Sequence, residues 1–206
     1  MEWDRYWSKG TWITRFVDWI HKNCFSTLFA SRVTKFVRQG SHVLDAGCGS
    51  GITSRKLQDA ACCSVVGLDL SLPALSRASR YLADVVRADM RCLPFASHMF
   101  DVVYNQGVME HFSSPEEAGG DLRRVLKRDG LLVFLVPYCF SPLRFIYELM
   151  KELGILRFWI GEEQAFLSRN QLWSLLQRCG CRPLLIERIW LTTLLGLGVG
   201  TNDVRN

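Results

Sequence analysis

Three aspartates, each closing a short apolar segment, are the residues of this sequence best suited to binding a ligand. They are Asp45, Asp69 and Asp89. If the three segments are neighbouring strands of a parallel sheet, the carboxylates meet at the sheet edge where such folds bind small molecules. Asp69 lies 22 residues after Gly47 (69 − 47), close to the ~20-residue spacing at which an acid accepts hydrogen bonds from a ribose. The spacing therefore predicts a ligand that contains adenosine.

A glycine-rich turn follows the first aspartate, in the stretch VLDAGCGSG over Val43–Gly51. Gly47 and Gly49 allow the backbone to approach a ligand closely, but such a turn also occurs in dinucleotide enzymes and in loops that bind nothing. The third glycine of the dinucleotide pattern would fall at Ile52, and the Asp45 carboxylate would repel a pyrophosphate. S-Adenosylmethionine instead carries an ammonium and a sulfonium group, so an acid favours this cofactor.

The residues around Asp89 suit an adenine ring. The Asp89 carboxylate can accept from the adenine amino group, and Leu70 and Met90 offer apolar contact to the ring. Two less specific interpretations stay open. Asp45 and Asp69 can merely cap turns, and Asp89 can be a solvated loop residue.

Strands and helices must alternate to bring these residues together. Short apolar runs predict strands at 42–46, 65–69, 85–88, 101–105, 131–137 and 182–190. Helical spacing of apolar residues predicts helices at 51–60, 73–82, 115–127 and 168–179. This alternation predicts an α/β fold with a doubly wound, mostly parallel sheet.

We expect a single domain over residues 1–206, because compact domains commonly have about 100 to 200 residues. The helical pattern of residues 12–38 predicts one or two helices before the sheet, and a last short strand is possible within 196–206. The four expected parts are N-terminal lid and helices (1–40), cofactor-binding core (41–137), helical substrate flap (138–167) and C-terminal helix and strands (168–206).

Composition favours a cytoplasmic protein. The N-terminal residues lack the features of a secretory signal, and the longest apolar runs, Leu131–Val136 and Leu191–Leu195, are far shorter than the ~20 residues that span a bilayer. The eight cysteines form no CxxC pair, which favours reduced thiols and no structural metal. A net charge of +5 without a long basic run makes nucleic acid an unexpected partner.

Four sequence blocks in the expected order resemble the class I methyltransferase superfamily. They are VLDAGCGSG at 43–51, GLDLS at 67–71, the block from Arg87 to Phe112, and LRRVLKRDGLLVFLVP at 122–137. The similarity is strongest to the small-molecule branch that includes the ubiquinone and menaquinone methyltransferases. It implies a seven-stranded Rossmann-like sheet and S-adenosylmethionine as the cofactor.

The resemblance also implies roles for individual residues. Gly47 and Gly49 would approach the methionine moiety, Asp45 would orient it, and Asn105 and Gln106 would lie beside the sulfonium, although Gln106 can instead be structural. The complete expected cofactor-binding set is Asp45, Gly47, Cys48, Gly49, Asp69, Leu70, Asp89, Met90, Asn105 and Gln106. The N-terminal segment from Glu2 to Trp7 resembles a lid whose aromatic side chains cover the cofactor, but these side chains can equally pack on the first helix.

His111 is the candidate general base, since an imidazole titrates near neutral pH and the loop after the fourth strand faces the methyl group. A packing role for His111 is the open alternative. Some relatives use a Glu-x-x-Glu-His metal site here, whereas this chain has Gly107 in place of the first ligand. We therefore predict no metal.

The acceptor is expected to be a small apolar or aromatic molecule, such as a quinone, a lipid or a metabolite. A pocket for it would use the flap aromatics, unless these only cover the sheet: Tyr138, Phe140, Phe145, Tyr147, Phe158, Trp159 and Phe166. Arg144, Lys151 and Arg157 among them suggest contact with an anionic membrane surface. The alternatives are an RNA or protein methyltransferase and a noncatalytic binding module.

Overall fold

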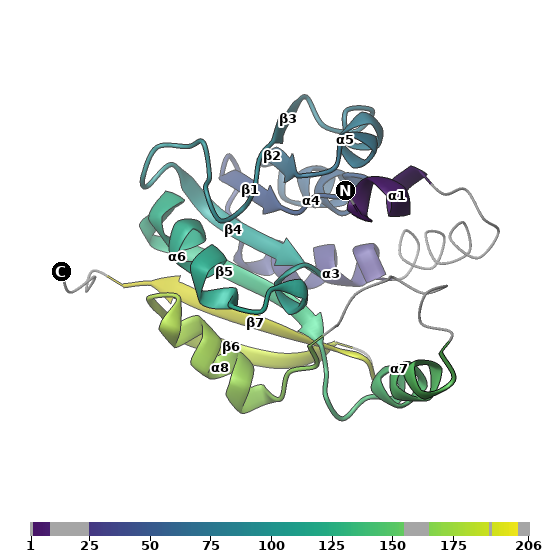
Figure 1. Ribbon diagram of the computed structural model, residues 1–206. Helices are drawn as coiled ribbons and strands as arrows, with labels where there is room; N and C mark the ends of the chain where they lie inside the picture. Colours follow the sequence, from purple (N-terminus) through teal and green to yellow (C-terminus); the bar gives the residue numbers. More distant parts are fainter. Residues whose placement is uncertain (1, 9–24, 155–164, 190, 202–206) are drawn as a thin grey trace.

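The computed structural model describes residues 2–8, 25–154, 165–189 and 191–201, and Figure 1 shows the arrangement of its elements. The strands are β1 (His42–Ala46), β2 (Ser64–Asp69), β3 (Asp84–Arg87), β4 (Phe100–Gln106), β5 (Leu126–Pro137), β6 (Cys181–Ile189) and β7 (Thr193–Gly200). The helices are α1 (Glu2–Ser8), α3 (Ser26–Val33), α4 (Ile52–Ala61), α5 (Leu72–Ala78), α6 (Pro115–Val125), α7 (Pro142–Glu152) and α8 (Arg169–Arg178). Two short 3-10 helices are η2 (Thr34–Phe36) and η3 (Met109–His111).

The seven strands form one sheet in the order β3-β2-β1-β4-β5-β7-β6. The pairs β1 with β2, β2 with β3, β1 with β4 and β4 with β5 are parallel. Strand β7 is antiparallel to both β5 and β6. The chain therefore builds the sheet outward from β1 to one edge, returns to β4, and builds toward the other edge.

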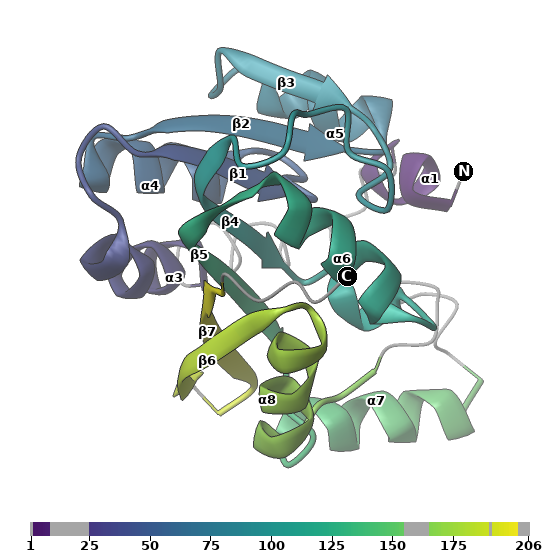
Figure 2. The same cartoon turned by 90° about the vertical axis from the view of Figure 1, so that its left-hand side faces the viewer.

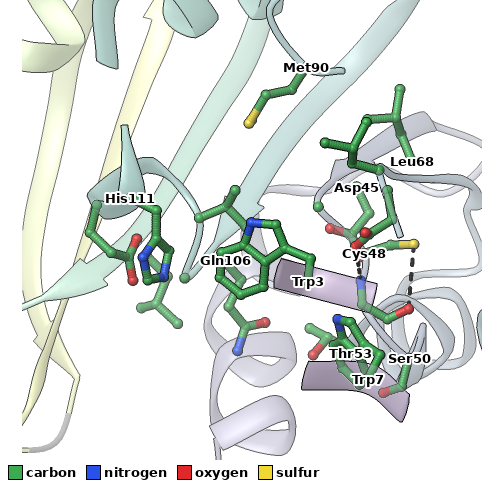
Figure 3. A pocket seen from close by; sticks show the side chains of 18 of the residues that line it. Trp3, Trp7, Asp45, Cys48, Ser50, Thr53, Leu68, Met90, Gln106 and His111 are labelled. Atoms are coloured by element: carbon green, nitrogen blue, oxygen red, sulfur yellow. Dashed lines mark hydrogen bonds between the residues drawn. The ribbon is translucent and has the colours of Figure 1, made fainter. Parts of the chain in front are cut away.

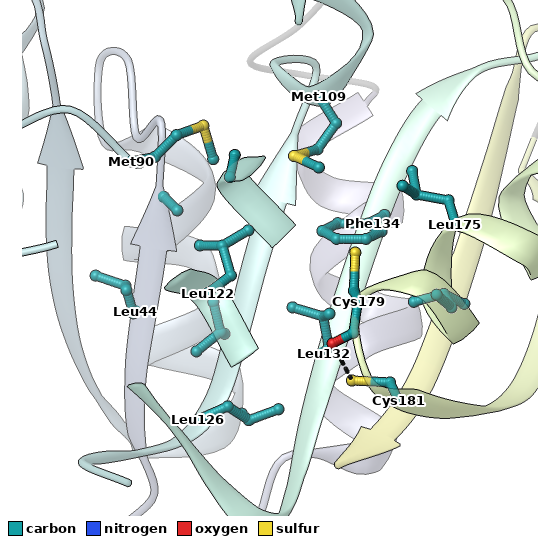
Figure 4. Close-up of a cluster of buried hydrophobic side chains, with 14 of the residues drawn as sticks. Leu44, Met90, Met109, Leu122, Leu126, Leu132, Phe134, Leu175, Cys179 and Cys181 are labelled. Carbon is teal, nitrogen blue, oxygen red and sulfur yellow. Dashed lines mark hydrogen bonds between the residues drawn. The ribbon is translucent and has the colours of Figure 1, made fainter. Parts of the chain in front are cut away.

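Helices cover both faces of the sheet, as Figure 2 shows. Alternate residues of each strand point to opposite faces, so Leu44 packs in the core on the α6 and α8 side (Figure 4), whereas Val43 packs in the core on the α3, α4 and α5 side. Asp45 lies on the same side as Val43. Its carboxyl group therefore points toward α4.

The reversal of strand order between β1 and β4 is the feature that positions the site. Neighbouring strands that lead to helices on opposite faces leave a crevice at their carboxyl ends, where ligands bind in open α/β sheets. The turn after β1, the end of β2, and the loops after β3 and β4 all lie at this edge.

The strand positions predicted from the sequence agree with the structure to within a few residues, except at the start of β5 and the start of β7. Helix α6 ends at Val125 and β5 begins at Leu126, because Phe100 of β4 pairs with Leu126 before a register shift. Strand β7 begins at Thr193 rather than after residue 195. Its glycines weakened the strand pattern, but Gly196 is required because a Cβ there would lie 2.9 Å from the Leu172 side chain of α8.

Candidate functional site

A cavity of about 1170 Å³ opens at the carboxyl edge of the sheet. Its walls come from the turn after β1, the end of β2, α5, the loops after β3 and β4, the end of β5 and helix α1. Figure 3 shows Asp45 and Cys48 on one side of it and His111 on the other. The cavity lining contains these residues of the expected set: Asp45, Gly47, Cys48, Gly49, Asp69, Leu70, Asp89, Met90, Gln106 and His111.

The glycine turn is held in place by backbone hydrogen bonds to β2. The N–H groups of Gly47 and Cys48 both donate to the Leu68 carbonyl, at 2.7 and 2.9 Å. Gly47 has φ +94°, and a Cβ on it would lie 2.5 Å from Val108. A larger residue is therefore excluded both by the backbone conformation and by the closeness of the loop after β4.

Asp45 lies under this turn and is 2% exposed. Its Oδ2 accepts hydrogen bonds from Ser54 of α4, at 2.5 Å, and from the Tyr104 hydroxyl of β4, at 2.6 Å. Its Oδ1 is buried without a hydrogen-bond partner among the described residues. Burial raises the pKa of Asp45 to about 7, although the hydrogen bonds from Ser54 and Tyr104 oppose the rise.

Asp69 accepts backbone hydrogen bonds on both carboxylate oxygens. Gly49 N–H donates to Oδ2 and Ser71 N–H donates to Oδ1, each at 2.9 Å. Burial nevertheless raises the pKa of Asp69 above its ordinary value. The residue thus connects the glycine turn to the start of α5, while it also lines the cavity.

Asp89 is more exposed and is paired with Arg91 of the same loop. The Arg91 guanidinium donates to both carboxylate oxygens, with Nη2 to Oδ2 at 2.6 Å, and this pairing lowers the pKa of Asp89. Met90 beside it is buried and reaches the same wall of the cavity. This wall offers an acid and a thioether at the place expected for adenine.

Asn105 is the expected site residue that does not line the cavity. It is fully buried, its amide Nδ2 donates to the Ala46 carbonyl, and its Oδ1 accepts from Met109 N–H at 3.1 Å. Both ends of the side chain are therefore used to connect β1 to the loop after β4. Gln106, the next residue along the strand, points to the other side and lines the cavity.

His111 ends η3 and faces the cavity from the side opposite Asp45 (Figure 3). Burial lowers the pKa of His111 to about 4, and its Nδ1 is buried without a hydrogen-bond partner among the described residues. The imidazole is thus neutral at pH 7 and able to accept a proton. Glu110, the residue before His111, also lines the cavity and is 3% exposed.

Helix α1 lies against this edge of the sheet and contributes two tryptophans to the cavity wall. Trp7 covers the glycine turn so closely that a Cβ on Gly49 would lie 2.8 Å from the indole. Arg77 of α5 donates to the Trp7 carbonyl at 2.7 Å and stacks its guanidinium 5.3 Å from the Trp7 ring. Trp3 contacts His111 edge to face, with ring centroids 5.0 Å apart.

Sequence reasoning did not identify Ser54, Tyr104 and Glu110 as site residues. Ser54 and Tyr104 are the partners of Asp45, and Tyr104 is 59 positions away from it. Parallel pairing of β1 and β4 places Tyr104 beside Asp45, so knowledge of the strand order would have supplied the missing signal. Glu110 had no comparable signal, because an acid in a polar loop is ordinarily solvated.

The flap residues divide into described and undescribed groups. Tyr147 packs against Phe166, whereas Phe140 and Phe145 are about three-quarters exposed. Arg157, Phe158 and Trp159 lie outside the described residues, as do residues 12–24 of the segment 12–38 for which helices were expected. Leu143 of α7 lines the cavity, but contact of this helix with a membrane stays a prediction.

Two further features concern the described part of the chain only. None of its helices combines the length and apolar character needed to cross a lipid bilayer. Its His, Cys, Asp and Glu side chains form no group of three or more placed to hold a metal ion.

Residues 44–134 match a family model described as a methyltransferase domain. Over 113 residues the chain is 35% identical to the demethylmenaquinone methyltransferase of Renibacterium salmoninarum, covering 52% of this chain and 47% of that protein. Over 111 residues it is 36% identical to the tRNA U34 carboxymethyltransferase of Pseudomonas paraeruginosa, covering 50% and 34%. The chain thus spans less than half the length of either relative.

The fold is shared with a chain of the solved complex between the Haloferax volcanii Trm112 methyltransferase activator and a methyltransferase. The TM-score is 0.77 with 98% of both chains covered, at 20% sequence identity. At this identity the similarity is one of fold. It supports the seven-stranded Rossmann-like architecture.

Proposed function

Because the chain belongs to the class I S-adenosylmethionine-dependent methyltransferases, we propose that its cavity binds S-adenosylmethionine and that the enzyme methylates a small apolar or aromatic acceptor. The observation that supports this most strongly is the composition of the cavity. Buried acids and a glycine turn line one end, and apolar side chains with a neutral histidine and the buried Glu110 line the other.

The residues at the first end suit the cofactor. The buried Oδ1 of Asp45 lacks a partner, and an ammonium group would satisfy it directly or through one water molecule. Gly47 and Gly49 have positive φ and no Cβ, so the backbone of the turn itself lines the cavity. Asp69 would accept from the ribose hydroxyls, and Asp89 with Met90 would contact the adenine.

The second end suits an apolar acceptor. Its lining includes Val108, Phe112, Leu135, Val136, Pro137 and Leu143. Pockets for one small molecule typically have volumes of about 300 to 1000 Å³, so the 1170 Å³ cavity has room for the cofactor and a small acceptor together. A cation at this end is the Arg91 guanidinium, which lies 5.8 Å from the centroid of the Phe112 ring and is already paired with Asp89.

When bound, S-adenosylmethionine would supply a methyl group whose carbon is attacked in line by the acceptor nucleophile, while the C–S bond breaks and the sulfur leaves as the neutral thioether of S-adenosylhomocysteine. The chain contributes alignment of the acceptor and exclusion of water. For a hydroxyl acceptor, the new O–C bond makes the hydroxyl proton strongly acidic, and His111 accepts it. A histidine with a pKa near 4 suffices, because the proton becomes acidic only as the bond forms.

The acceptor class is tested by transfer of a labelled methyl group from S-adenosylmethionine into a cell extract that is then separated into organic-soluble, RNA and protein fractions. We expect label in the organic-soluble fraction, and none with Asp69→Ala. His111→Gln should reduce the label by about 10²-fold, the lower end of general-base effects. It should leave cofactor affinity unchanged.

Two results would contradict the proposal. Label confined to RNA or protein would assign the enzyme to a macromolecular substrate. Absence of label in every fraction, with cofactor binding intact, would favour the noncatalytic module.

A further inference from the structure

Trp3 of α1 lines the cavity. In the view of Figure 3 its indole lies between Cys48 of the glycine turn and His111. Its ring centroid lies 5.0 Å from that of His111, with the ring planes inclined by 75°. Trp3 therefore borders both the cofactor end and the acceptor end of the cavity.

The two tryptophans of α1 have different surroundings. Trp7 lies over Gly49 and carries the Arg77 guanidinium on its ring. Trp3 meets His111, an imidazole that is neutral at pH 7 because burial lowers its pKa to about 4. The bond from Arg77 to the Trp7 carbonyl fixes α1 against α5, and so fixes where Trp3 enters the cavity.

The place of the sulfonium follows from the proposed function, on which this inference rests. With the methionine moiety held at Gly47 and the ribose at Asp69, the sulfonium would lie between these two residues. There Val108 closes on Gly47, since a Cβ on Gly47 would be only 2.5 Å from its side chain. Trp3 and His111 line the same cavity and contact each other.

We propose that the face of the Trp3 indole binds the positive charge of the sulfonium. An aromatic face attracts a cation through its quadrupole, indole most strongly, and desolvation strengthens the attraction. S-Adenosylhomocysteine, the product, is a neutral thioether at the same position. Trp3 therefore makes the site selective for the charged donor over the uncharged product, which assists product release.

The experiment is calorimetry of S-adenosylmethionine and S-adenosylhomocysteine with the wild-type protein and three variants. Trp3→Leu should weaken binding of S-adenosylmethionine about tenfold, the range expected of a partly desolvated cation–π contact, and should change S-adenosylhomocysteine affinity much less. The affinity of Trp3→Phe for S-adenosylmethionine should lie between that of the wild-type protein and that of Trp3→Leu. Trp7→Leu, the matched control on the same helix, should weaken both compounds by similar factors.

Each outcome has a definite meaning. Equal losses for both compounds in Trp3→Leu, or no loss for either, would overturn this inference and leave the proposed function standing. Wild-type protein that bound neither compound would overturn both.

Discussion

The pKa of the Asp45 carboxyl group is determined by its buried position under the glycine turn. One oxygen is bonded to two hydroxyl groups and the other is buried without a partner. Desolvation outweighs the hydrogen bonds, so the pKa rises to about 7. At neutral pH the group is poised to lose its proton when a cation binds beside it, which suits a ligand with an ammonium group.

Asp45 should make folding stability fall as pH rises. Its pKa is 3.8 unfolded and about 7 folded, so the folded state binds the extra proton between these values. The stabilisation is complete below pH 3.8 and is lost as pH rises through 7, with an upper limit of about 4 kcal/mol. Urea unfolding of Asp45→Asn and wild type from pH 4 to 8 should show the variant gaining relative stability with pH.

Asp101→Asn is the control for this series. Asp101 is partly buried, which raises its pKa, but hydrogen bonds from Lys127 and from His42 N–H lower it overall. The difference between this variant and wild type should therefore change at low pH, not near pH 7. A pH-independent difference for Asp45→Asn would show that Asp45 does not titrate as described.

At this scale, strand ends and glycines could be predicted from sequence because they depend on local pattern. The hydrogen-bond partners of the polar side chains could not be predicted in this way. Asn105 has the same sequence context as a cofactor contact, yet its amide is used between Ala46 and Met109. Which polar side chain faces a ligand and which one connects two loops depends on strand register, which a single segment does not encode.

At the scale of elements, the residue after α4 has a left-handed backbone conformation that glycine would adopt at lower energy, but this chain has a cysteine there. Cys62 follows the helix with φ 50° and ψ 48°, in the left-handed region. Its N–H donates to the Gln58 carbonyl and its own carbonyl accepts from Gly40 N–H, both at 2.9 Å. These bonds position the entry to β1 and β2, so the conformation is kept despite its cost to a residue with a Cβ.

Cys62→Gly should stabilise the protein by about 0.5 to 1 kcal/mol, because glycine adopts this conformation without steric cost and the side chain is exposed. For a chain of this size that is a rise in Tm of about 1 to 4 °C. Thermal unfolding followed by circular dichroism measures it. Cys62→Ala, which keeps the Cβ, should give no rise, and a lower Tm in Cys62→Gly would contradict the assignment of strain.

Elements were predictable in type wherever their pattern was periodic. The alternation of strands and helices from 42 to 137 was confirmed, with boundaries shifted by a few residues. Strand β7 was only partly anticipated, because three glycines interrupt its apolar pattern, although a Cβ on Gly196 would lie 2.9 Å from Leu172 of α8. Tertiary contact, rather than local preference, decides such a strand.

At the scale of the whole molecule, the order of the strands determines where function can reside. The reversal between β1 and β4 brings the glycine turn, Asp69, Met90 and His111 to one edge. Helix α1, far from them in sequence, closes over the same edge through Trp3 and Trp7. The central claim is therefore that this edge binds an S-adenosyl cofactor.

The most direct test is calorimetric titration of the wild-type protein with S-adenosylmethionine, with S-adenosylhomocysteine, and with NAD as the control adenosine cofactor. We expect saturable one-to-one binding of the first two and none of NAD, whose pyrophosphate would meet the Asp45 carboxyl group. Binding of NAD, or failure to bind S-adenosylmethionine, would contradict the account.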